Sequence, residues 1–312
     1  VVLTHGHMDH TGFLPRLVKM GFNGPIWGTA PTFDITEIIL RDSAKIQEED
    51  ARRANKEGFT KHDPAKPLYT VKDAERTLPL FEEQNRDEWI TVSDDIFLRF
   101  RYNGHILGAT FIEIEAYGKK FVFSGDVGRR EDPLLDDPQK PEKADVLFLE
   151  STYGDRFHPD EEDNKLEHIV NDTIGKGGTL IIPSFAVERA QLLMYLLWQL
   201  NKAGKIPSVP IILDSPMGAD VLKLFNKHYD WHKLSREECK SMCEQVRIVQ
   251  SFKETWEIID EDQPKIIIAG SGMVGGGRVL TYLQQYLDRP ETTVMLAGYQ
   301  AEGTRGRQLL EG

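Results

Sequence analysis

Three histidines and an aspartate lie within six residues near the start of the chain, at His5, His7, Asp9 and His10. They follow an apolar run that is typical of a strand. Residues two apart on a strand point to the same side, so His5 and His7 can face one metal ion. Asp9 and His10 stand where a helix is expected to begin and can face a second ion. Imidazole suits zinc, and two metals about 3.5–4 Å apart can hold a phosphate for in-line hydrolysis.

One such cluster cannot complete two coordination spheres, so further ligands must come from elsewhere in the chain. His105 lies in a glycine-flanked loop between two predicted strands, residues 96–102 and 110–116. Asp126 directly follows another predicted strand, residues 120–124, in a second glycine-containing loop. Because loops at strand ends can converge at one edge of a sheet, the sequence predicts that His105 and Asp126 join the histidine cluster.

The elements that must position these residues are those of an α/β protein. In the first half, strands are expected at residues 1–4 and 25–28, and helices at 9–20, 31–56 and 71–80. A hairpin turn at 117–119 is expected between the strands 110–116 and 120–124, and a buried strand at 146–149. From about residue 155, short apolar strands alternate with helices, which predicts a parallel sheet with crossover helices. These strands are expected at residues 179–182, 210–213, 265–269 and 293–297, with helices at 187–203 and 277–287.

The composition narrows the class of protein. With 312 residues, 40% hydrophobic and 28% charged, the chain has the profile of a globular protein with one large or two ordinary domains. It contains no apolar run of about 20 residues and no recognisable signal peptide, so we expect no membrane partner and a cytoplasmic location. Its two cysteines, Cys239 and Cys243, are interpreted as ordinary helix residues. The net charge of −12 argues against nucleic-acid binding by bulk charge, although a local metal cluster and arginines can still attract phosphate.

The chain resembles a known family. The segment from His5 to His10 is similar to the H-x-H-x-D-H signature of the metallo-β-lactamase fold, and His105 and Asp126 match its next two ligand motifs. Four later strings resemble the β-CASP branch of that fold, namely LESTYG at 149–154, PSFAVERAQ at 183–191, GSGM at 270–273 and GYQAEGT at 298–304. They look most similar to RNA-processing members, akin to the endonuclease subunit of cleavage and polyadenylation and its bacterial and archaeal relatives.

The resemblance implies an αββα sandwich, residues 1–154, with an inserted β-CASP domain of mostly parallel sheet, residues 155–312. It also implies two zinc ions. His5, His7 and His105 would bind the first, Asp9 and His10 the second, and Asp126 would bridge them. Asp9 and Asp126 are thus expected to be catalytic as well as metal-binding. Glu150 matches an acidic residue that supports a histidine acting as general acid.

The family's remaining histidines would follow Gly312 and its first strands would precede Val1, so the sandwich is expected to be incomplete here. We therefore expect this stretch of chain by itself to bind the second metal poorly.

The activity that the resemblance implies is zinc-dependent hydrolysis of RNA phosphodiester bonds, in RNA processing or decay. An endonuclease is expected, with 5′–3′ exonuclease activity as a further option. RNA is the expected partner, and a homodimer or an RNA-processing complex are further options. Substrate contacts are predicted at Ser184, Arg189, Ser271, Gly272, Arg278 and Arg305.

Three other functions stay open at this stage. The first is a small-molecule hydrolase of the same fold, acting on a lactam, a thioester or a sulfate ester. The second is a DNA-processing β-CASP nuclease. The third is a catalytically silent scaffold subunit of an RNA-processing complex.

Overall fold

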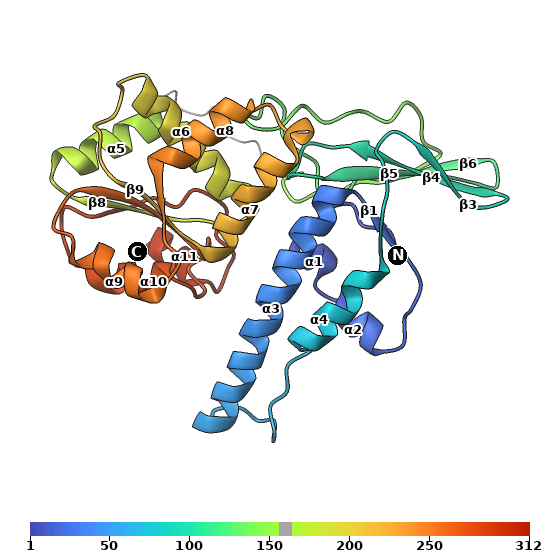
Figure 1. The fold of residues 1–312 in the computed structure, drawn as a ribbon, viewed down its shortest axis with the longest axis horizontal. Helices are drawn as coiled ribbons and strands as arrows, with labels where there is room; N and C mark the ends of the chain where they lie inside the picture. Colours follow the sequence, from blue (N-terminus) through green and yellow to red (C-terminus); the bar gives the residue numbers. More distant parts are fainter. Residues whose placement is uncertain (156–163) are drawn as a thin grey trace. The chain divides into compact units, whose positions relative to one another are not determined.

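A computed structural model of the chain describes residues 1–155 and 164–312. The chain divides into two compact units, each with its own five-stranded sheet (Figure 1). The first unit contains Val1–Gly154 and the short segment Asp230–Lys233. The second contains Asp155–Tyr229 and Leu234–Gly312. Among the described helices, none is long and apolar enough to cross a membrane.

The sheet of the first unit has the strand order β3-β4-β5-β6-β7 and is antiparallel except for the β6–β7 pair. Its strands are β3 (Trp89–Ser93), β4 (Ile96–Tyr102), β5 (Thr110–Ala116), β6 (Lys119–Phe123) and β7 (Val146–Phe148). The predicted hairpin turn is confirmed, since Ala116 pairs with Lys119. Tyr117 and Gly118 between them have φ angles of 51° and 74°. Positive φ at both central residues is the geometry that fits the right-handed twist of a two-residue hairpin.

The remaining elements of the first unit are short, apart from one long helix. They are α1 (Met8–Thr11), α2 (Leu14–Lys19), β1 (Ile26–Gly28), α3 (Ala30–Glu57), α4 (Val71–Thr77), the 3₁₀ turn η1 (Leu78–Leu80) and β2 (Phe81–Glu83), which pairs with β1 in parallel. The strand predicted at residues 1–4 is limited to a bridge between Val2 and Trp27. The prediction of a single helix at residues 9–20 is wrong. It divides into α1 and α2, because Pro15 has no N–H to donate to the carbonyl four residues earlier.

The strand predicted at residues 146–149 is present as β7, but the prediction that it is buried is wrong. Leu147 and Phe148 are 50% and 52% exposed. In the described sheet β7 is the edge strand and pairs only with β6. An apolar run alone therefore identified the strand but not its environment.

The sheet of the second unit is entirely parallel, as predicted, with the order β10-β9-β11-β8-β12. Its strands are β8 (Thr179–Pro183), β9 (Ile211–Asp214), β10 (Val246–Ile248), β11 (Lys265–Ala269) and β12 (Thr293–Val294). Its helices are α5 (Lys165–Gly175), α6 (Arg189–Lys202), α7 (Pro216–Lys227), α8 (Arg236–Gln245), α9 (Phe252–Asp260), α10 (Val279–Tyr286) and α11 (Arg305–Glu311). The 3₁₀ turn η2 (Tyr229–Trp231) crosses the boundary between the two units.

The central strands of this parallel sheet carry the core of the second unit. Ile181, Ile212 and Ile267 are fully buried in one apolar cluster, to which α9 and α10 add side chains. Burying each such side chain contributes roughly 1.5–3 kcal/mol. All five strands run the same way, so the loops that follow their carboxyl ends lie at one edge of the sheet. Ser184, Ser215 and Ser271 lie in these loops.

Candidate metal centre

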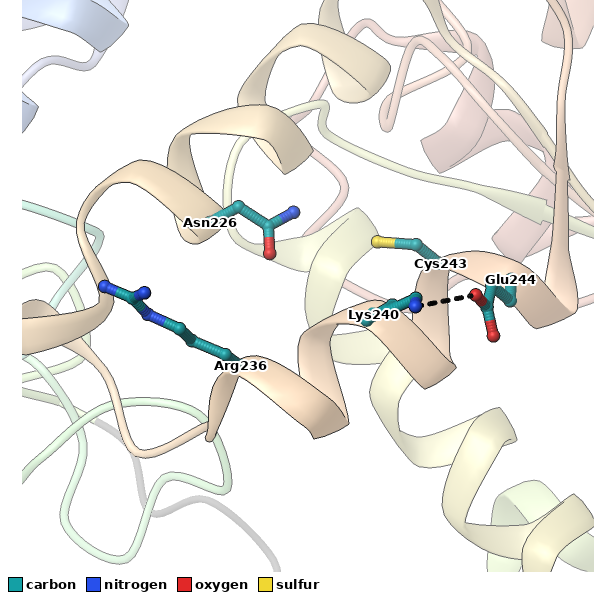
Figure 2. Close-up of a pocket in the computed structure, with 5 residues that line it drawn as sticks. All are labelled: Asn226, Arg236, Lys240, Cys243 and Glu244. Atoms are coloured by element: carbon teal, nitrogen blue, oxygen red, sulfur yellow. Dashed lines mark ion pairs between the residues drawn. The ribbon is translucent and has the colours of Figure 1, made fainter.

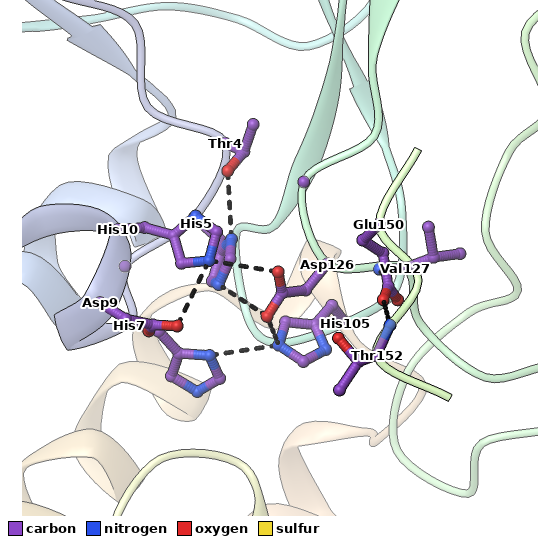
Figure 3. Close-up of polar contacts among 12 residues, drawn as sticks. Thr4, His5, His7, Asp9, His10, His105, Asp126, Val127, Glu150 and Thr152 are labelled. Atoms are coloured by element: carbon purple, nitrogen blue, oxygen red, sulfur yellow. Dashed lines mark hydrogen bonds and ion pairs between the residues drawn. The ribbon is translucent and has the colours of Figure 1, made fainter. Parts of the chain in front are cut away.

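Three segments that are far apart in the sequence bring the predicted ligands together in the first unit (Figure 3). His5 and His7 lie just before α1, and His7 is the residue that precedes its first turn. Asp9 and His10 are within α1. His105 comes from the loop between β4 and β5, and Asp126 from the loop after β6. Loops at the ends of β4 and β6 thus bring His105 and Asp126 to histidines about a hundred positions earlier in the sequence.

The distances define a compact cluster. One possible ligand atom from each of His5, His7, His105 and Asp126 lies within 4.8 Å of all the others. The Nε2 atom of His105 is 3.1 Å from Nδ1 of His7. The Oδ2 atom of Asp126 is 3.4 Å from Nε2 of His105 and 3.6 Å from Nε2 of His5. These four residues can therefore direct their lone pairs at one cation.

His10 lies against the other oxygen of the same carboxylate, and Asp9 lies against His10. His10 Nε2 lies 3.2 Å from Oδ1 of Asp126 and 3.6 Å from Oδ2 of Asp9. The side chain of Asp9 is 78% exposed, so it has room to move toward a ligand. One oxygen of Asp126 thus faces His5 and His105, and the other faces His10.

A buried nitrogen that lacks a hydrogen bond among the described residues supports the fit of a metal to this site. His5 is fully buried, and among the described residues its Nε2 has no hydrogen-bond partner. Its other ring nitrogen lies 3.1 Å from the hydroxyl oxygen of Thr4. A metal-binding histidine commonly has one nitrogen on the metal and the other hydrogen-bonded to an oxygen. A cation beside Nε2 would complete that arrangement and satisfy a polar atom that is costly to leave unpaired.

The protonation states also suit metal binding. Burial, together with neighbouring imidazoles, lowers the pKa of His5 strongly. Burial likewise lowers the pKa of His7 to about 4 and lowers that of His105. A hydrogen bond from His10 lowers the pKa of Asp126, even though burial opposes it. Near neutral pH these groups are therefore neutral imidazoles and a carboxylate, which are the forms that ligate metals.

Glu150 lies beside this cluster and is held by main-chain amides (Figure 3). Its carboxylate accepts hydrogen bonds from the N–H of Val127 at 3.3 Å and from the N–H of Thr152 at 2.9 Å. Its own N–H donates to the hydroxyl of Ser124 at 3.0 Å. Glu150 is therefore bonded to both sides of the loop that carries Asp126.

One residue that contacts both ligand loops was not predicted from the sequence. Asn103 is 1% exposed and forms hydrogen bonds with the backbone of both His105 and Asp126. The sequence feature that could have indicated this role is the position of Asn103 between a predicted strand and the Gly-His loop. Asparagine is common in loops, so this signal does not separate it from a simple turn residue.

The predicted substrate residues all lie in the second unit, in the loops at the carboxyl edge of its sheet or at the starts of helices. Ser184 and Gly272 are buried, Arg189 begins α6, and Arg305 is exposed at the start of α11. The hydroxyl of Ser271 accepts a hydrogen bond from the N–H of Gly276 at 3.2 Å.

Arg278 is the member of this set that is most firmly held by its neighbours. Its Nη1 lies 3.3 Å from a carboxylate oxygen of Asp214 and also donates to Thr255. Its guanidinium carbon is 4.8 Å from the ring centre of Phe252.

A separate surface cavity lies in the second unit and contains none of the predicted site residues (Figure 2). Its volume is about 550 Å³, and it is lined by Asn226, Arg236, Lys240, Cys243 and Glu244. Lys240 and Glu244 form an ion pair across one helical turn. Burial raises the pKa of the Cys243 thiol and that of Cys239, the latter to about 11. Both thiols therefore stay protonated near neutral pH, as expected of ordinary helix residues.

With this geometry established, comparison with known families identifies the class of protein. Residues 1–171 match the metallo-beta-lactamase superfamily, and residues 190–309 match the Beta-Casp domain. The chain belongs to the metallo-beta-lactamase superfamily and carries a Beta-Casp domain. The predicted fold class is thereby confirmed, with an α/β architecture and a parallel sheet in the second unit.

Individual relatives extend this assignment. The chain is 32% identical to "Ribonuclease TTHA0252" of Thermus thermophilus over 99% of the chain and 69% of that protein. It is 33% identical to "Transcription termination factor FttA" of Methanosarcina mazei over 100% of the chain and 49% of that protein. It is also 31% identical to an "RNase J-like protein" of Methanocaldococcus jannaschii over 100% of the chain and 69% of that protein. The chain thus spans about half the length of the termination factor and about two thirds of the other two.

Proposed function

We propose that this protein is a zinc-dependent ribonuclease that hydrolyses RNA phosphodiester bonds in the cytoplasm. The observation that carries the proposal is the cluster of His5, His7, His105 and Asp126, whose possible ligand atoms lie within 4.8 Å of one another. Relatives named as ribonucleases, similar over nearly the whole chain, support RNA as the substrate. Residues 1–154 would form the catalytic domain and residues 155–312 the β-CASP domain. Residues 156–163 of the latter lie outside the described residues.

Two zinc ions are proposed because the side chains fall into two groups that share Asp126. His5, His7 and His105 would hold one ion, and Asp9 and His10 the other. When bound, such ions supply Lewis acidity and make water a nucleophile near neutral pH. The chain's own part is to supply neutral imidazoles and an ionised carboxylate in a fixed arrangement. Burial favours the neutral imidazoles of His5, His7 and His105, and the His10–Asp126 hydrogen bond favours the ionised carboxylate of Asp126.

Glu150 is proposed as a catalytic residue that acts close to this centre. Its carboxylate accepts the N–H of Val127, the residue next to Asp126. It is thus fixed at the rim of the cluster by the main chain, where a carboxylate can orient a protonated group beside the scissile bond. The family resemblance implies that this protonated group is a histidine.

RNA contacts are proposed at the carboxyl edge of the second unit's sheet. The N–H groups of Ser184 and Ser271 themselves donate to the carbonyls of Ala269 and Gly276. Other N–H groups of these loops, including that of Gly272, would bind phosphate oxygens, as commonly happens where a strand turns into a helix. Arg189 and Arg305 would add charge-assisted bonds to phosphates. For Arg278, the ion pair with Asp214 fixes the guanidinium in place, which would favour a single phosphate position over a flexible contact.

Cleavage assays with the full-length protein test this proposal. A circular, internally labelled RNA reports endonuclease activity alone, and a linear RNA with a labelled 5′ end reports release of 5′ mononucleotides. A single-stranded DNA of the same sequence, a chromogenic lactam and a thioester test the alternative functions. We expect cleavage of both RNAs, loss of cleavage with a chelator, and recovery with zinc.

The matched variants are Asp126→Asn and Asp94→Asn, the second in an exposed turn of the same unit. We expect Asp126→Asn to lower kcat by at least about 100-fold, as loss of a key electrostatic group does, and Asp94→Asn to be unchanged. Cleavage that survives in Asp126→Asn would refute the site. A protein that binds zinc but cleaves no substrate would instead identify a scaffold subunit.

A further inference from the structure

Asn103 is the residue that joins the two loops which carry the later members of the metal centre. It directly follows β4 and is 1% exposed. Its side-chain amide donates to two carbonyl oxygens, that of Ser124 at 2.9 Å and that of Asp126 at 2.8 Å. Its side-chain oxygen accepts the N–H of His105 at 3.3 Å. One buried amide thus contacts both the His105 loop and the Asp126 loop.

The main chain of Asn103 adds to the same connection. Its carbonyl accepts the N–H of Gly128 at 2.9 Å, and its N–H donates to the carbonyl of Ala109 at 3.2 Å. The two loops are in direct backbone contact here, because a Cβ atom at Gly128 would lie 2.1 Å from the carbonyl oxygen of Gly104. The contact leaves no space for a side chain at residue 128. The hydrogen bonds of Asn103 therefore hold the two loops at this close distance.

We propose that Asn103 is a positioning residue that sets the spacing between His105 and Asp126 and thereby the affinity of the metal centre. The inference rests on the proposed function, since it concerns the same centre. Only an amide of this length can donate to two carbonyl oxygens and accept an N–H at the same point. A carboxylate in its place would face the oxygens of Ser124 and Asp126 without a proton to share, and would push the Asp126 loop away.

The discriminating variants are Asn103→Asp, which keeps the shape and removes the donor, and Asn103→Ala, which leaves room for water. Asn55→Asp is the matched control. Asn55 also bonds to backbone through both amide atoms, with Ala65 as its partner, but it is exposed at the end of α3. The change in charge is the same at both positions.

The primary measurement is zinc affinity of the full-length protein, by competition with a chromophoric chelator at a temperature well below unfolding. We expect about 10–100-fold weaker binding in both Asn103 variants, the range typical for partners of metal ligands. We also expect a comparable fall in kcat with KM for RNA unchanged. Asn55→Asp should behave as the wild type in all three measurements.

Two results would overturn the inference. Wild-type zinc affinity in Asn103→Ala, with only a lower melting temperature of the metal-free protein, would show that Asn103 serves stability alone. A rise in KM for RNA with kcat unchanged would show that Asn103 affects RNA binding and not the metal centre. If Asn103→Asp does not fold, Asn103→Ala decides by the same two measurements. A wild-type protein that binds no zinc would refute the proposed function itself, which is a different outcome from either of these.

Discussion

The imidazole of His10 lies 3.2 Å from Oδ1 of Asp126, on the side of the carboxylate that His5 and His105 do not approach. This contact raises the pKa of His10, in contrast to the lowered values of the other cluster histidines. The carboxylate is therefore shared between two groups of side chains. Removing His10 should therefore affect metal binding differently from removing Asp126.

We predict that His10→Ala keeps one tightly bound zinc per chain, whereas Asp126→Ala weakens both zinc positions by at least about tenfold. His10 belongs to one group, but Asp126 contributes an oxygen to each. Calorimetric titration of the metal-free, full-length protein measures both stoichiometry and affinity. His62→Ala, at an exposed position of the same unit, is the control. Two equal zinc sites in His10→Ala would show that the grouping is incorrect.

We predict that Asp73 makes the first unit sensitive to acid. Burial opposes ionisation of its carboxyl, but hydrogen bonds from Thr70 and Lys19 lower its pKa from 3.8 to about 2. Because the folded-state pKa is the lower one, the stabilisation is present above the ordinary pKa and is lost as the pH falls toward about 2. Asp73→Asn should cost about 1 kcal/mol at neutral pH, as loss of a helix-capping partner does, and should lose less stability on acidification. Urea unfolding across this pH range measures both effects, and equal slopes in the two proteins would contradict the assignment.

We predict that Lys265→Met destabilises the second unit by about 2 kcal/mol or more, since it leaves buried carbonyls unpaired. Lys265 is 1% exposed, and its ammonium group donates to the carbonyls of Ile258, at 2.6 Å, and Glu261 at the end of α9. Lys240→Met removes an exposed ion pair and should change stability by less than about 1 kcal/mol. Chemical denaturation of the three proteins gives the comparison. Equal stability of both variants would show that the buried contacts contribute little.

Much of the fold follows from local patterns that the sequence contains. The strands β4 and β5 lie at the predicted residues, and the turn at Tyr117 and Gly118 forms as expected. These predictions succeed because alternation, apolar runs and turn residues act over a few neighbouring positions. The split between α1 and α2 depends on a single residue, because Pro15 lacks the N–H donor that would continue an otherwise helical pattern.

The sequence by itself determined which side chains are available for chemistry and which strand ends carry them, because metal ligands need particular residue types at short spacings. Only the tertiary structure decided what surrounds them. It shows that β7 is exposed, that Arg278 is paired with Asp214, and that Asn103 joins the loops of His105 and Asp126. The contacts of Arg278 with Asp214 and of Asn103 with Asp126 join residues more than 20 positions apart in the sequence. All three features depend on how strands pair and which side chains become buried. Such long-range pairing cannot be predicted from the local periodicity of the sequence.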